Sequence, residues 1–123
     1  MAEGRRQSAE RRGRHGETLA ALMLRLKGYR ILGRRVRTHA GEIDLIARAP
    51  SGLICFIEVK ARADEAQAAT ALGTRQQARI ARAAALYLAA RPGLAAKGVR
   101  FDVVSILPRT LPRHVRDAWR ADD

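Results

Sequence analysis

Two acidic residues and one lysine stand out in this 123-residue sequence, because they lie in or next to runs of apolar residues. Asp44 lies between an isoleucine and a leucine, and Glu58 lies between an isoleucine and a valine. Lys60 follows Glu58 by two residues. A buried, ionised carboxylate is tolerated only when it is paired, hydrogen-bonded or bound to a metal. The sequence therefore favours a site that brings these three side chains together.

The turn between two predicted strands decides how the two acids face each other. Residues 42–49 and 53–60 have strand patterns, and the Pro-Ser-Gly sequence at 50–52 is typical of a tight turn. A three-residue turn places Asp44 opposite Glu58, with Cβ atoms roughly 5 Å apart. An even-numbered turn would put the two acids on opposite faces. We therefore predict an odd-numbered turn, or a compensating bulge.

Two carboxylates at that separation repel each other, and a divalent cation would remove the repulsion. Hard oxygen ligands suit Mg²⁺ or Mn²⁺. Lys60 shares the face of Glu58, roughly 6–7 Å further along the strand, where an ammonium group can orient or help to deprotonate a metal-bound water. The cluster therefore predicts metal-assisted phosphodiester hydrolysis. The alternative is an ion pair between Glu58 and Lys60, with Asp44 capping a loop.

The charge of the chain favours a polyanionic partner. The formal net charge is +12, from 24 basic and 12 acidic residues, and only three of the basic residues are lysines. Nucleic acid is the first candidate, DNA more than RNA; an arginine-rich proteome is the alternative source of the charge. For arginines on the predicted long helix, a solvated polar face is the alternative to phosphate binding. The candidate phosphate contacts are Arg34, Arg35, Arg75, Arg79 and Arg82.

Composition also disfavours several other classes of protein. The single cysteine, Cys55, lies in an apolar run and is expected in the core, so neither a disulfide within the chain nor a Cys/His zinc site is expected. No apolar run is long enough to span a bilayer, so no membrane partner is expected. No apolar segment follows the arginine pairs near the N-terminus, which argues against a secretory signal. A cytoplasmic protein is the expectation.

The elements that must position these residues form one α/β domain with a single sheet between helices. The length predicts one core, with a flexible basic arm over residues 1–14 and the folded domain over residues 15–120. The predicted elements are a helix over 17–27, strands over 29–38, 42–49 and 53–60, a helix over 70–90, a strand over 99–107 and a short helix around 115–119.

The first predicted helix has two apolar sides. Glu17 lies on the thinner side, with three small or medium residues, Ala20, Ala21 and Leu24. The broader side, which has the stronger helical periodicity and is expected to face the core, consists of Leu19, Leu22, Met23 and Leu26.

Other polar residues give weaker signals. Asp102 lies in an apolar strand and is expected to pair with a neighbouring arginine. Glu42 shares a face with Asp44 and is expected to form a structural ion pair. The three histidines show no metal-ligand spacing, so no role is assigned to them.

The two strand motifs resemble those of a known family. Residues 41–47, Gly-Glu-Ile-Asp-Leu-Ile-Ala, followed by residues 56–62, Phe-Ile-Glu-Val-Lys-Ala-Arg, look like the signature of the bacterial YraN-like family. That family belongs to the PD-(D/E)xK nuclease superfamily and is distantly related to archaeal Holliday junction resolvases. The resemblance runs from about residue 13 to residue 119. It implies an αβββαβ restriction-endonuclease-like core, with a central mixed sheet flanked by helices.

The resemblance also implies roles for residues of the two motifs. Asp44 matches the catalytic aspartate of the superfamily, and Glu58 and Lys60 match its E-x-K motif. Asp44 and Glu58 would then bind Mg²⁺ or Mn²⁺, with the carbonyl of Val59 as an additional ligand. The implied activity is that of an endonuclease acting on DNA, including branched structures. A non-catalytic nucleic-acid-binding module that retains the fold is the alternative.

Two further catalytic positions follow from the resemblance. Glu17 matches an acid of the first helix, although an acid in a first turn is also favourable toward the helix dipole. Gln77 matches a polar residue of the following helix. Where the family pattern has a lysine before that glutamine, this chain has Gln76. The likeness to resolvases also favours a homodimer, by fold-level analogy.

Overall fold

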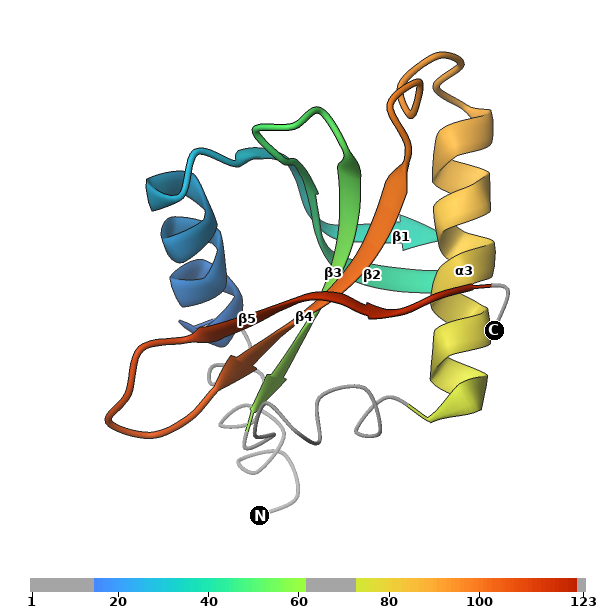
Figure 1. The fold of residues 1–123 in the computed structure, drawn as a ribbon. Helices are drawn as coiled ribbons and strands as arrows, with labels where there is room; N and C mark the ends of the chain where they lie inside the picture. The colour runs from blue at the N-terminus through green and yellow to red at the C-terminus, as the bar shows by residue number, and fades with distance from the viewer. Residues whose placement is uncertain (1–14, 62–72, 122–123) are drawn as a thin grey trace.

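A computed structural model of the chain describes residues 15–61 and 73–121. In that part of the chain, a five-stranded mixed sheet lies between two helices (Figure 1). The predicted α/β class, with one sheet flanked by helices, is confirmed. The basic arm over residues 1–14 lies outside the described residues. No helix described here is long and apolar enough to cross a membrane.

The order of the strands in the sheet follows their order in the chain. Neighbouring strands are antiparallel except for β3 and β4, which are parallel. A parallel pair needs a crossover connection, and helix α3 (Thr74–Ala89) lies in that connection. The strands are β1 (Arg30–Thr38), β2 (Gly41–Arg48), β3 (Ile54–Ala61), β4 (Val99–Ile106) and β5 (Arg113–Trp119).

Two predicted elements need correction. The segment expected to form a short helix around residues 115–119 is strand β5, which pairs with the edge of β4 and stacks Trp119 on Phe101 with ring centroids 4.2 Å apart. These are long-range contacts, which the periodicity of a seven-residue segment does not reveal. Helix α3 begins at Thr74 and not near residue 70, because Gly73 has an extended backbone.

Apolar side chains cover both faces of the sheet, which explains why β3 is apolar on both sides as far as Glu58. Cys55 is buried there, as expected. One face packs against the N-terminal helix, residues 15–26, through Leu45, Ala47, Cys55, Ile57 and Val104. The opposite face packs against α3 through Ile43, Ile46, Ile54 and Phe56.

The N-terminal helix presents the opposite side from the one expected. Leu19, Leu22 and Leu26 are 47%, 52% and 81% exposed, whereas the thinner side with Ala20, Ala21 and Leu24 is buried. Small residues on that side let the helix backbone approach the sheet closely; a Cβ atom added at Gly16 would lie 3.4 Å from Ile106 and 3.6 Å from Val59. Because Glu17 belongs to this side, the packing carries its carboxylate toward the sheet.

Candidate functional site

The turn between β2 and β3 has the predicted length. The backbone N–H of Ala49 donates to the carbonyl of Leu53 at 2.9 Å, which closes a three-residue turn. In this register Asp44 comes beside Glu58. The backbone N–H of Val59 donates to Oδ2 of Asp44 at 2.8 Å, and the backbone N–H of Asp44 lies 3.5 Å from Oε1 of Glu58. The two acids are therefore neighbours across the β2–β3 pair.

Strand β2 departs from regular geometry at Asp44. Ile43 packs in the cluster under α3, whereas Leu45 packs in the cluster under the N-terminal helix. Residues two apart in a regular strand share a face, so the alternation breaks between them. The pairing with β3 ends at Leu45, and the pairing with β1 passes over Arg35 and Asp44. This break leaves the Asp44 carboxylate within reach of both β3 and the N-terminal helix.

Three carboxylates gather at this break, from the N-terminal helix and from β2. One oxygen each of Glu17, Glu42 and Asp44 lies within 4.8 Å of the other two. Glu17 is buried, Asp44 is half-buried and Glu42 is exposed. Glu58 adjoins the group through Asp44. Such a set of oxygen donors could hold a metal ion.

Glu42 is a candidate ligand that the sequence analysis assigned only to a structural ion pair. That ion pair exists, since Nε of Arg37 lies 3.6 Å from Oε2 of Glu42. The signal for a second role was the two-residue spacing between Glu42 and Asp44, which places both side chains on one face of a strand. The break in β2 comes only after Asp44, so this rule still holds for the pair.

The surroundings of these acids disfavour their ionised forms. Burial raises the pKa of Glu58 to about 8, and the nearby charge of Asp44 raises it further. Burial also raises the pKa of Asp44, although the hydrogen bond from the N–H of Val59 acts against it. Burial raises the pKa of Glu17, opposed by its hydrogen bond from Arg35. A bound cation would favour the ionised forms of these acids.

Lys60 points from β3 toward α3. Its Nζ donates to Oε1 of Gln76 at 3.2 Å, and its charge lowers the pKa of both Asp44 and Glu58. Lys60 therefore lies within electrostatic reach of the two acids. Gln77, the position matched by the family resemblance, is half-buried one residue further along α3, and its catalytic role stays a prediction. So does the role of the Val59 carbonyl as a metal ligand.

Arginines of β1 contact the N-terminal helix beside the acids. Nε of Arg35 donates to Oε2 of Glu17 at 2.8 Å, and Nη2 of Arg34 donates to Oγ1 of Thr18 at 2.8 Å. β1 is an edge strand of the sheet. This end of β1 is thus basic and adjoins the acidic group.

A second set of arginines lies on the exposed side of α3. They line a hollow of about 420 Å³ together with Gln76 and Ala78. The hollow reaches the site from two directions. Gln76 contacts Lys60, and the stem of Arg79 packs on Gly41 at the start of β2, where an added Cβ atom would lie 3.0 Å from it. The arginines are Arg75, Arg79 and Arg82.

Another buried carboxylate, Asp102 of β4, has a full set of partners. Nε and Nη2 of Arg100 each donate to it at 2.8 Å, Nε2 of His114 lies at 2.7 Å, and the backbone N–H of Asp117 donates at 2.9 Å. Burial acts to raise the pKa of Asp102, but the hydrogen bonds from His114 and Arg100 outweigh it and hold the pKa below its ordinary value. The expected pairing with an arginine is confirmed.

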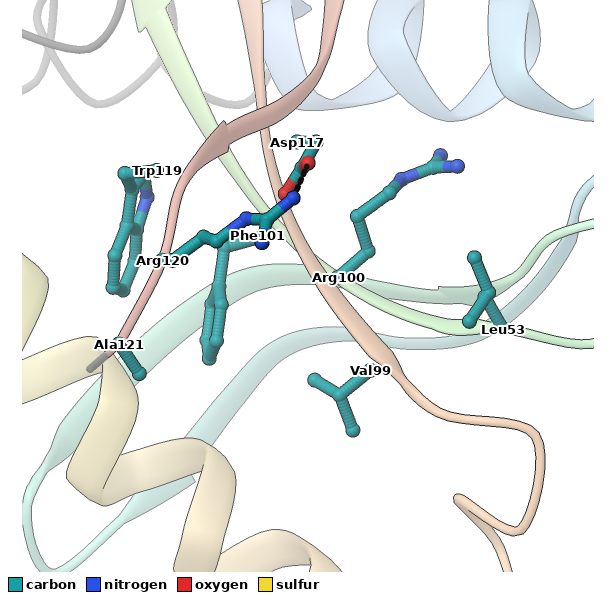
Figure 2. A pocket seen from close by; sticks show the side chains of 8 residues that line it. All are labelled: Leu53, Val99, Arg100, Phe101, Asp117, Trp119, Arg120 and Ala121. Atoms are coloured by element: carbon teal, nitrogen blue, oxygen red, sulfur yellow. Dashed lines mark hydrogen bonds and ion pairs between the residues drawn. The ribbon is translucent and has the colours of Figure 1, made fainter. Parts of the chain in front are cut away.

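The Asp102 network borders a separate hollow of about 360 Å³ (Figure 2). There Arg120 turns toward Asp117, at 3.1 Å. His114 was not singled out from the sequence, because its contact with Asp102 depends on the β4–β5 pairing. The remaining residues lining this hollow are Leu53, Val99, Arg100, Phe101, Trp119 and Ala121.

Comparison with known proteins finds many close relatives. A sequence model described as "Uncharacterised protein family UPF0102" matches residues 16–106. The UPF0102 protein amb4503 of Paramagnetospirillum magneticum is 53% identical, covering 94% of this chain and 92% of its own. A UPF0102 protein of Parvibaculum lavamentivorans is 54% identical, covering 92% and 84%, and the UPF0102 protein Atu0303 of Agrobacterium fabrum is 53% identical, covering 94% and 93%. These names give a family and no activity.

Proposed function

The chain belongs to the uncharacterised protein family UPF0102, the YraN family, and on the geometry of its acidic site we propose that it is a Mg²⁺- or Mn²⁺-dependent nuclease acting on DNA. The observation that carries this proposal is the junction between β2 and β3. There Asp44 and Glu58 lie side by side without a cation of the chain between them, and Lys60 lies within electrostatic reach.

The residues at the junction suit a divalent metal. Glu17, Glu42 and Asp44 offer oxygen atoms within 4.8 Å of one another, and Glu58 adjoins them. Hard oxygen ligands favour Mg²⁺ and Mn²⁺. When bound, such a metal supplies Lewis-acid polarisation of a phosphoryl oxygen and a more acidic water. Lys60, held by Gln76, is placed to orient the attacking water or to stabilise the leaving oxygen.

The basic surfaces support a nucleic-acid substrate. The hollow on α3 is lined by three arginines, and β1 places further arginines beside the acids. Positive charge on both sides of an acidic centre suits a phosphate backbone that must approach buried carboxylates. Branched or irregular DNA is the substrate class that the resolvase likeness favours.

The direct test is cleavage of labelled junction, flap, duplex and single-stranded DNA in Mg²⁺ or Mn²⁺. We expect cleavage of at least one substrate, and a loss of about 10²-fold or more in Asp44→Asn and Lys60→Ala. Asp117→Asn and Lys97→Ala are matched controls, since they change the same residue types outside the acidic site. Cleavage that survives Asp44→Asn, or the absence of cleavage of every substrate, would contradict the proposal.

A non-catalytic nucleic-acid-binding module is the second candidate. The net charge of +12 favours phosphate contacts whether or not chemistry follows. This function predicts DNA binding that weakens steeply with salt and does not change with EDTA or in Asp44→Asn. Salt-dependent binding in EDTA, together with no cleavage in either metal, would favour the module over the enzyme.

A further inference from the structure

Arg35 has a backbone conformation that residues other than glycine rarely adopt. Its φ is +50° in the middle of strand β1. Such a conformation costs energy and persists only when the surroundings hold it in place. The strained residue lies where the β1–β2 pairing passes over Arg35 and Asp44, so both strands are irregular at the same point of the sheet.

This conformation aims Arg35 at the acidic site. Successive side chains of a regular strand point to opposite faces, yet Arg34 and Arg35 both reach the N-terminal helix, at Thr18 and Glu17. The Glu17 side chain is 8% exposed, whereas the Arg35 side chain is 37% exposed. The guanidinium thus contacts a buried carboxylate through Nε at one end and reaches solvent at the other.

Arg35 fills the role of a cation at this site. Glu17 lies with Glu42 and Asp44 in the group whose oxygens could hold a metal, and Arg35 supplies positive charge to its most buried member. A divalent cation bound by these oxygens would need the Glu17 carboxylate that Arg35 now occupies. Among the described residues, Arg35 contacts no acid other than Glu17.

We propose that Arg35 is a positioning residue that acts as the resident counter-cation of Glu17, that a divalent metal displaces it, and that the released guanidinium then binds a phosphate of the DNA. The inference rests on the proposed nuclease function. A guanidinium is suited to both partners, because its fork matches carboxylate and phosphate oxygens alike. Metal binding and phosphate binding are then linked through one side chain.

The first test compares the metal response of four proteins: wild type, Arg35→Gln, Arg35→Lys and Arg34→Gln. We expect Arg35→Gln to unfold at the lowest temperature in EDTA, to gain most in Tm from Mn²⁺, and to bind Mn²⁺ several-fold more tightly by calorimetry. Arg35→Lys keeps the charge and should respond like wild type, and so should Arg34→Gln, whose recorded partner is the hydroxyl of Thr18. An equal gain in Tm from Mn²⁺ in wild type and Arg35→Gln would overturn the proposal.

The second test measures duplex DNA binding against salt, in EDTA and in Ca²⁺, with the DNA checked for integrity. Each phosphate contact contributes about 0.9 to the slope of log K against log salt. We expect Arg35→Gln to lose about one unit of slope relative to wild type in Ca²⁺ and none in EDTA. The same loss under both conditions, or no loss under either, would contradict the exchange.

Neither test depends on cleavage. If both differences appear but no DNA is cut, the nuclease function fails and the exchange stands. If DNA is cut in an Asp44-dependent way but the differences are absent, the exchange alone fails. If wild type binds no Mn²⁺, both proposals fail.

Discussion

Buried carboxylates on two neighbouring strands have opposite surroundings. Asp102 on β4 accepts hydrogen bonds from Arg100, His114 and a backbone N–H, and its pKa is held low. Glu58 on β3 has a backbone N–H at 3.5 Å, lies beside the carboxylate of Asp44, and its pKa is raised. The first group is complete within the chain, whereas the second lacks a cation.

Burial alone therefore does not mark a functional carboxylate, because Asp102 is 0% and Glu58 6% exposed. The partners distinguish them. Arginines pair with the outer acids Glu17 and Glu42, but in the described part of the chain no arginine pairs with Asp44 or Glu58. The charge that is missing between these two is what a divalent metal would supply.

The largest effect on stability is expected at the complete group. Asp102→Asn removes the charge that faces Arg100, and breaking a buried pair on one side costs about 3–5 kcal/mol. Urea denaturation in EDTA measures the loss. The matched change at the incomplete group, Glu58→Gln, should not destabilise the protein under the same conditions. Equal losses in the two variants would remove the distinction between the groups.

The packing that brings Glu17 to the site should show a slightly smaller effect. Leu24→Ala empties a buried position on the thinner side of the N-terminal helix and should cost about 2–4 kcal/mol. Leu22→Ala on the exposed side should cost about 0.5 kcal/mol or less. Denaturant unfolding of both variants measures this difference. A larger loss in Leu22→Ala would mean that the helix packs through its broader side.

The pH dependence of the metal-free protein should reveal the incomplete group. The pKa of Glu58 is 4.5 when unfolded and about 8 when folded, so the folded state binds more protons between these values. Its contribution to stability is full below pH 4.5 and is lost as the pH rises toward 8. In EDTA at pH 8, Glu58→Gln should be more stable than wild type by about 1 kcal/mol. No gain in this variant would show that Glu58 is already satisfied.

The complete group should respond to pH with the opposite sign, and less. The pKa of Asp102 lies below its ordinary value of 3.8, so its contribution is present above that pH and is lost as the pH falls further. Unfolding followed from pH 5 down to pH 2 should show a smaller acid-induced loss in Asp102→Asn than in wild type. Parallel acid curves for the two proteins would contradict the low pKa.

The parts of the site that local rules control could be predicted from the sequence. The Pro-Ser-Gly turn fixed the register, and the register brought Asp44 to Glu58. The spacing of the E-x-K motif placed Lys60 on the same strand. The α/β class followed from the order of the elements, since each long element has a clear period.

The rest depended on choices between faces and on distant contacts. The N-terminal helix buries its alanines and not its leucines, and periodicity cannot decide which apolar side a close-packed sheet admits. The contact of His114 with Asp102 required the pairing of β5 with β4. The positive φ of Arg35 and the break at Asp44 leave no local signal, because neither residue is a glycine or follows a proline.

Calorimetric titration with Mn²⁺ tests the central claim most directly, using wild type, Asp44→Asn and Asp102→Asn. We predict one Mn²⁺ site in wild type that is lost or weakened at least about tenfold in Asp44→Asn and retained in folded Asp102→Asn. Mn²⁺ binding that is unchanged by Asp44→Asn would contradict the account, because the incomplete carboxylate group would then not be the metal site.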